Sequence, residues 1–229
     1  MKRRSGWALT GIGVLLVGAA ANQIWAQGVV RPGAVAPAAP AAPGVVTPPG
    51  ENKKVLSIRR MPRLNKVKQP TPSYNTSATR TAPGRARDWA VFDVVYDSIP
   101  EWLDEVVVTY YLMSEHRGSD AKKEYSFYQT TVRYVDVPRG EHMACVVLPP
   151  GPLLRYGDQF IGMAVEITAA DGTLLASKDE VQGWTPPAGD WWKKPEVTES
   201  KSVVKRDGLV DRSKTPFGLI NIDEYEVVK

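Results

Sequence analysis

Residues 105–113 read EVVVTYYLM and residues 125–137 read YSFYQTTVRYVDV, and these two stretches decide the predicted fold. The first is almost continuously β-branched or aromatic, as in a central strand that is buried on both faces. The second alternates polar and apolar residues over its whole length, which is the period of a strand with one buried face.

Working outward, four more stretches have strand character, and turn-forming residues separate them. We expect Ile99-Pro100 to end the first of these strands, Pro138-Arg139-Gly140 to form a turn, and residues 149–152 to turn the chain. No amphipathic helix is expected. The predicted fold is therefore all-β, an antiparallel sandwich over residues 88–182 with Greek-key connections. The four strands are 89–97, 142–148, 159–168 and 174–177.

The composition is that of a globular protein. Of 229 residues, 43% are hydrophobic and 24% are charged, which excludes disorder of the whole chain. The single cysteine excludes an intrachain disulfide framework, and two histidines with one cysteine argue against a structural zinc site. No glycine-rich nucleotide motif and no G-x-S-x-G motif is present, so we expect neither a cofactor nor a metal.

Residues 1–26 have the pattern of a secretory signal peptide. Lys2, Arg3 and Arg4 precede an apolar run over 7–21, and small residues permit cleavage after Ala21 or Ala26. An uncleaved anchor is the alternative, but the run is shorter than a spanning helix needs. We therefore expect export to a periplasmic, outer-membrane-associated or extracellular location, with no transmembrane helix once the signal is removed.

Residues 27–51 are rich in Ala and Pro, and repeated proline favours an extended, semi-rigid linker. A basic arm follows over residues 52–87, which hold ten basic residues and no acid, whereas residues 88–229 hold 15 basic and 24 acidic residues. The chain thus combines a basic arm with an acidic body.

Three interpretations of the basic arm compete. It is a solvated linker, or it lies along the acidic body of its own chain or of a neighbour, or it binds nucleic acid or anionic lipid. Exposed ion pairs each contribute only about 0–1 kcal/mol, so charge alone would not hold the arm. We expect protein docking by an edge strand, with nucleic acid disfavoured. The predicted partner-binding residues are Leu56, Ile58, Arg59, Arg60 and Arg63.

Residues 183–229 form a tryptophan-rich extension that we expect to pack on the sandwich. Residues 217–222 and 225–228 would add an edge strand or wrap across it. Two interpretations apply to its three tryptophans, Trp184, Trp191 and Trp192. We expect either an aromatic patch that binds a sugar or a protein, or a loop that the tryptophans fasten to the core.

The remaining reactive side chains favour structural roles. Cys145 lies in an apolar strand, where a buried and inert thiol is expected. His116 and His142 have no Ser, Cys or acid nearby in the sequence that would indicate a catalytic triad. The acids of the body lack calcium-site spacing and are expected to be solvated; they include Asp171, Asp179, Glu180 and Asp190.

The run LPPGPLLRYGDQFIGMAVEITAADG, residues 148–172, resembles the immunoglobulin-like and fibronectin type III pattern. The resemblance implies a tyrosine corner, with the Tyr156 hydroxyl turned back to the backbone. The paired cysteines of antibody domains are absent. The layout of signal, proline-rich linker and one such domain is similar to exported immunoglobulin-like proteins encoded with bacterial type IV pilus genes.

Taken together, these features predict a non-enzymatic envelope protein. Its work would be structural or protein-binding, associated with a type IV pilus or another envelope assembly, with self-association through the arm as one route. The alternative is a carbohydrate-binding or adhesin module that uses the three tryptophans. A hydrolase would need clustered carboxylates around a groove.

Overall fold

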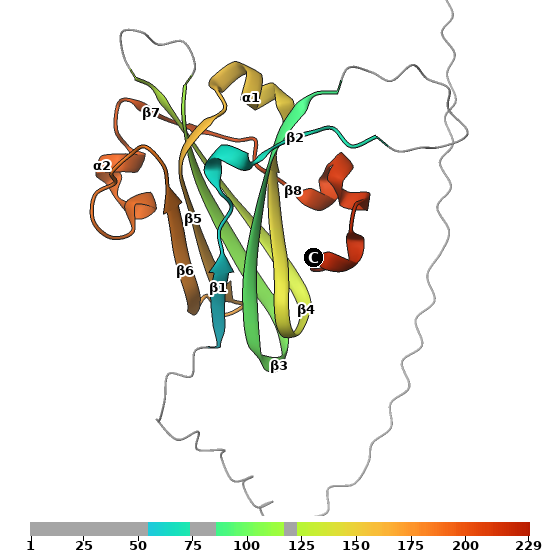
Figure 1. The fold of residues 1–229 in the computed structure, drawn as a ribbon. Coiled ribbons are helices and arrows are strands. Elements are labelled where there is room, and N and C mark those ends of the chain that lie inside the picture. The colour runs from blue at the N-terminus through green and yellow to red at the C-terminus, as the bar shows by residue number, and fades with distance from the viewer. Residues whose placement is uncertain (1–54, 74–85, 117–122) are drawn as a thin grey trace, which may run out of the picture. The chain divides into compact units, whose positions relative to one another are not determined.

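The computed structural model describes residues 55–73, 86–116 and 123–229. The predicted signal peptide, the predicted linker and part of the basic arm lie outside these ranges. Residues 50–229 form one compact unit (Figure 1).

Two long strands dominate the fold. β3 (Asp88–Glu115) and β4 (Tyr125–Leu148) pair antiparallel along their whole length, from Ala90 opposite Leu148 to Glu115 opposite Tyr125. This long hairpin folds back on itself (Figure 1). The bend lies where the register shifts between Ser98 and Trp102, opposite residues 138–140 of β4.

The bend corrects two sequence predictions. Ile99-Pro100 does not end a strand, and Pro138-Arg139-Gly140 is not a turn between strands, because β3 and β4 continue through both positions. Gly140 has a φ of 134°, a backbone conformation that would be strained in a residue with a side chain. Proline and glycine therefore curve these strands without ending them.

The folded hairpin produces two facing layers. The first consists of residues 88–98 and 140–148, with β1 (Leu56–Arg60) and β2 (Lys68–Pro70) on one side and β8 (Val210–Asp211) on the other. The second consists of residues 103–115 and 125–137, flanked by β5, β6 and β7. These three strands are Gln159–Ala169, Leu174–Val181 and Val203–Arg206.

The architecture is thus the predicted all-β sandwich, and β7 pairs parallel with β4 in an otherwise antiparallel arrangement. The core lies between the layers. Phe92 of the first layer meets Phe160 of the second edge-on, with ring centroids 5.0 Å apart. The Tyr134 hydroxyl accepts a hydrogen bond from the Cys145 backbone N–H at 3.2 Å, across the same gap.

A short helix that the sequence analysis did not expect joins the layers. α1 (Pro150–Tyr156) begins directly after β4, with a proline at its first position, and ends at Gly157. Tyr156 therefore ends a helix. The centroid of its ring lies 3.6 Å from the guanidinium carbon of Arg206, so a cation–π contact fixes the ring. Tyr156 therefore does not occupy the tyrosine corner that the resemblance implied.

The C-terminal extension wraps across the sandwich in short turns. Residues 217–222 do not form the predicted edge strand, because they lie in η4 (Pro216–Leu219) and at the start of η5 (Ile222–Glu224). Within residues 225–228, Val228 forms an isolated antiparallel bridge with Tyr134 of β4. The other short elements are η1 (Leu64–Lys66), η2 (Trp191–Lys193), η3 (Arg212–Lys214) and α2 (Pro195–Thr198). Among the described residues, no helix is long and apolar enough to cross a membrane.

Candidate functional site

The basic arm is part of the sandwich. β1 pairs antiparallel with β3, with Leu56 opposite Ser98 and Ile58 opposite Tyr96. Leu56 is fully buried and Ile58 packs against the core, so these two predicted docking residues hold the arm to its own chain. The sandwich therefore begins near residue 56, before the predicted boundary at residue 88.

Charge and backbone contacts complete this attachment. The Arg59 guanidinium forms an ion pair with Asp97 of β3. On the other side of β1, the Lys178 ammonium of β6 donates to the Arg59 carbonyl at 3.2 Å and reaches the Ile58 carbonyl at 3.5 Å. β1 therefore has β3 on one edge and a lysine cap on the other, which leaves little room for another strand.

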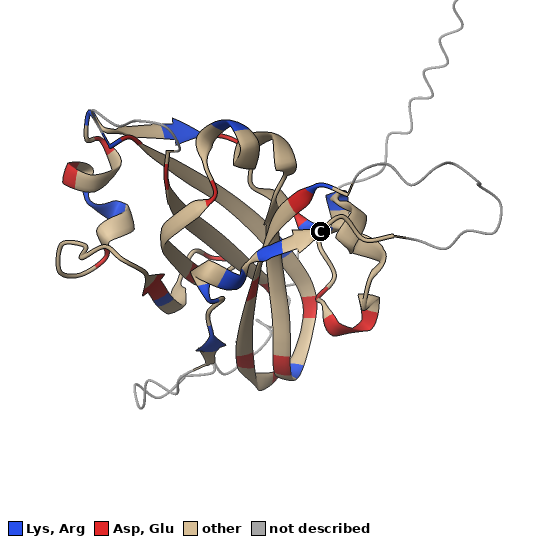
Figure 2. Ribbon diagram, turned by 45° about the horizontal axis from the view of Figure 1, so that its top comes forward, with Lys and Arg blue, Asp and Glu red and all other residues tan. Residues whose placement is uncertain are grey.

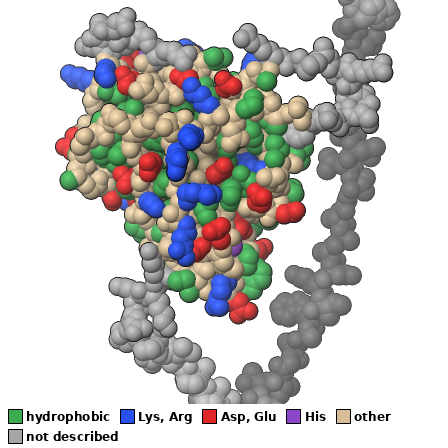
Figure 3. All heavy atoms as spheres, in the orientation of Figure 1, with side chains coloured by type: hydrophobic (Ala, Val, Ile, Leu, Met, Phe, Trp, Pro, Cys, Tyr) green, Lys and Arg blue, Asp and Glu red, His purple; other side chains and the backbone are tan. Residues whose placement is uncertain are grey.

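Two further arginines, at the end of β1 and just after it, and one lysine face solvent. Arg60 and Arg63 are exposed, as is Lys66 in η1, and none of the three forms an ion pair with a described residue. We call these three residues the basic stripe. In Figure 3, blue side chains run down the face that carries β1 and η1. Arg60 and Arg63 are thus available to a partner, whereas Arg59 is engaged within the chain.

The three tryptophans form a buried cluster. Trp191 is fully buried and Trp192 is 5% exposed, while Trp184 is half-buried. The Trp191 ring meets Trp184 and Trp192 edge-on at 5.3 and 5.7 Å. Its indole N–H donates to Asp179 at 3.1 Å. Trp191 and Trp192 therefore belong to the core, and they do not form an exposed sugar-stacking platform.

A buried carboxylate supports this cluster. Glu166 of β5 is 7% exposed; it pairs with the Lys193 ammonium and accepts a hydrogen bond from the Tyr111 hydroxyl at 3.1 Å. Burial, followed by the charge of Glu166, raises the pKa of Tyr111 to about 12. This ionic contact fastens η2 to the second layer.

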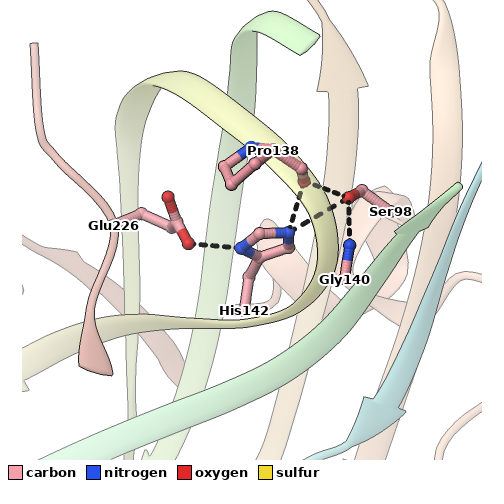
Figure 4. Close-up of polar contacts among 5 residues, drawn as sticks. All are labelled: Ser98, Pro138, Gly140, His142 and Glu226. Carbon is pink, nitrogen blue, oxygen red and sulfur yellow. Dashed lines mark hydrogen bonds and ion pairs between the residues drawn. The ribbon is translucent and has the colours of Figure 1, made fainter. Parts of the chain in front are cut away.

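A second polar cluster was missed in the sequence, and it lies at the bend (Figure 4). His142 sits between Ser98 and Glu226, with its Nε2 atom 3.0 Å from the Ser98 hydroxyl and its Nδ1 atom against the Glu226 carboxylate. The sequence analysis did not anticipate these two neighbours of His142. Ser98 and Glu226 come from distant parts of the chain, so residue spacing gave no signal.

The proton positions differ from those of a catalytic triad. His142 Nε2 lies 2.7 Å from the Pro138 carbonyl oxygen, which can only accept, so Nε2 carries a proton. The Ser98 hydroxyl also donates to the Pro138 carbonyl, and it accepts from the Gly140 N–H at 3.2 Å. A serine nucleophile needs an unprotonated Nε2 that takes its proton. This cluster instead ties both strand bends to the C-terminal segment.

Cys145 is buried, as expected, and the four acids that were expected to be solvated are exposed: Asp171, Asp179, Glu180 and Asp190. The thiol is buried, and burial followed by the charge of Asp93 raises its pKa well above the ordinary value. A thiol in such a setting is a poor nucleophile. Among the described residues, no group of His, Cys, Asp or Glu side chains could hold a metal ion.

One exposed apolar feature also went unnoticed in the sequence. Ile99 and Trp102 lie at the bend of β3 and are 54% and 61% exposed. Four exposed acids lie in the same bent region, Glu101 and Asp104 in β3 and Asp136 and Glu141 in β4. We call these six residues the acidic tip, and Figure 2 shows acidic residues gathered where β3 and β4 bend. The sequence signal was a tryptophan flanked by acids at a strand break.

Comparison with known proteins identifies a matching family and a similar fold. A family model matches residues 58–229, most of the chain, and the chain therefore belongs to that family. A crystal structure of a protein from Akkermansia muciniphila is similar, with a TM-score of 0.60 and 19% identity over 76% of this chain and 92% of that one. At this identity the likeness concerns the fold. No curated protein matches in sequence.

Proposed function

We propose that this protein is an exported, non-enzymatic structural component that binds other proteins in a pilus-associated or envelope assembly. The layout of the chain carries the proposal, because a predicted signal peptide and a proline-rich linker precede an all-β sandwich of the matched family. The predicted signal peptide supports export. A specific link to type IV pili is the finer form of the same proposal.

The side chains support binding over catalysis. In the Ser98–His142–Glu226 cluster, the Nε2 atom of His142 carries a proton and so cannot take one from the Ser98 hydroxyl. The Cys145 thiol is buried. The basic stripe, in contrast, presents charge that the described part of the chain leaves unpaired. Partly exposed charge of one sign favours encounter with a surface of the opposite sign.

Fractionation of the producing cells tests this function. We expect the protein outside the cytoplasm and enriched with sheared pili, as detected with an antibody. The double variant Arg60→Glu, Arg63→Glu should be exported normally and lose that enrichment. The control Lys201→Glu, Lys205→Glu changes two exposed lysines elsewhere and should retain it. A cytoplasmic location, or equal enrichment of both variants, would refute the proposal.

A further inference from the structure

The acidic tip has the makeup of a docking anchor. Trp102 is mostly exposed although tryptophan is among the side chains that gain most from burial. Binding hot spots are enriched in tryptophan and arginine, and a polar rim that excludes water surrounds them. At the tip, Ile99 and Trp102 supply the apolar centre and four carboxylates supply the rim.

The tip carries a net negative charge, because its four carboxylates outnumber the guanidinium of Arg139 in the same bend. Among the described residues, none of its four carboxylates forms an ion pair, and the nearby Arg139 side chain donates to the Ile99 carbonyl at 2.7 Å. A complementary partner would present cations, because a carboxylate that is desolvated without a partner weakens binding. The partner therefore needs basic side chains that can also cover an indole ring.

This same chain offers such a surface in the basic stripe. Arginine stacks on aromatic faces and pairs with carboxylates, so Arg60 and Arg63 suit both parts of the tip. Within one molecule the two surfaces do not pair. Arg60 lies opposite Val95, four residues or roughly 13 Å before Ile99 along β3, and Lys66 lies farther away, near Val91. Among the described residues, neither Arg60 nor Arg63 forms an ion pair with a carboxylate of the tip.

We infer that the acidic tip of one molecule docks on the basic stripe of a second copy. The contact is heterologous, since the two surfaces differ, and each molecule keeps one free tip and one free stripe. Repetition of the contact builds an open chain of subunits. The inference rests on the proposed function, which assigns protein binding to the basic stripe. It adds that one of the bound proteins is a second copy of this chain.

Sedimentation velocity of the purified protein tests the contact. We expect association that grows with protein concentration and weakens with salt, because the contact is largely ionic. Trp102→Ala at the tip and Arg60→Glu, Arg63→Glu at the stripe should each lower the association constant about 30-fold. Two controls, Leu219→Ala and Lys201→Glu, Lys205→Glu, alter an exposed apolar residue and exposed cations elsewhere and should leave it unchanged.

A mixture of the two variants separates this geometry from a symmetric one. The Trp102 variant retains a working stripe and the arginine variant retains a working tip, so together they should form a 1:1 complex that grows no further. Circular dichroism verifies that each variant is folded. A wild-type protein that stays monomeric at about 1 mM and low salt overturns the inference, as does a mixture without complexes. Pilus enrichment of a monomeric protein would leave the proposed function standing.

Discussion

Replacement of Trp191 by alanine distinguishes a core tryptophan from a ligand platform. The side chain is fully buried between Trp184 and Trp192, and it packs over Gly162 of β5. Removal of a buried tryptophan typically costs about 3–5 kcal/mol. The lost hydrogen bond to Asp179 adds little, because Asp179 is exposed and water can replace the indole N–H.

The size of the effect on melting follows from the length of the folded unit. For a domain of roughly 150–250 residues, 1 kcal/mol changes the melting temperature by about 2–4 °C. Trp191→Ala should therefore lower it by roughly 6–20 °C, as followed by circular dichroism. Trp191→Phe keeps a buried ring and loses the N–H donor, so its loss of unfolding free energy in urea should be clearly smaller.

The opposite result would refute the reasoning. If Trp191→Ala melts at the wild-type temperature, the tryptophan does not hold the extension to the sandwich. If, in addition, the variant loses binding to a glycan that the wild type binds, the residue acts as a platform. Trp184→Ala is the matched comparison, because the Trp184 side chain is only half-buried and should cost less.

Three further predictions concern the core. The Cys145 thiol, whose pKa burial raises, should resist alkylation at neutral pH until the protein is unfolded in urea; rapid labelling of the native protein would contradict this. Burial also raises the pKa of Tyr110 and Tyr134, so the folded state keeps their protons longer than the unfolded state. Unfolding free energy should thus be complete below about pH 10 and fall above it; a flat alkaline profile in urea titrations would count against buried phenols. Gly162→Val should destabilise by about 1–3 kcal/mol, since even a Cβ atom there would lie 3.1 Å from the Trp191 ring, and calorimetry measures the change.

The sequence predicted the fold class because strand signals are local. Alternating and continuous apolar runs located the material of β3, β4 and β5, and each run needs only its own residues to be recognised. The same local logic failed at Pro100 and Pro138. A proline removes one backbone donor, which is compatible with an end or with a bend, and only the pairing of β3 with β4 decides between them.

For the basic arm, too, the sequence indicated a strand, and the tertiary structure decided its partner. Its sequence showed an edge strand with a basic surface, and the predicted alternatives included docking on its own chain or on a neighbour. The pairing of Leu56 with Ser98 and the contact from Lys178 assign the strand to its own chain. The choice depended on which sheet edge was free, and that is a property of the assembled layers.

What the sequence determined by itself was the strand character of the residues in β3, β4, β5 and β6, the basic arm and the inert surroundings of Cys145. What only the tertiary structure decided was which side chains meet. Ser98, His142 and Glu226 converge because a long hairpin folds back and the C-terminal segment crosses it, and Trp191 is buried because η2 packs on β5. The physical reason is that periodicity reports how one segment is buried. Contacts between distant segments depend on the folding of the whole chain.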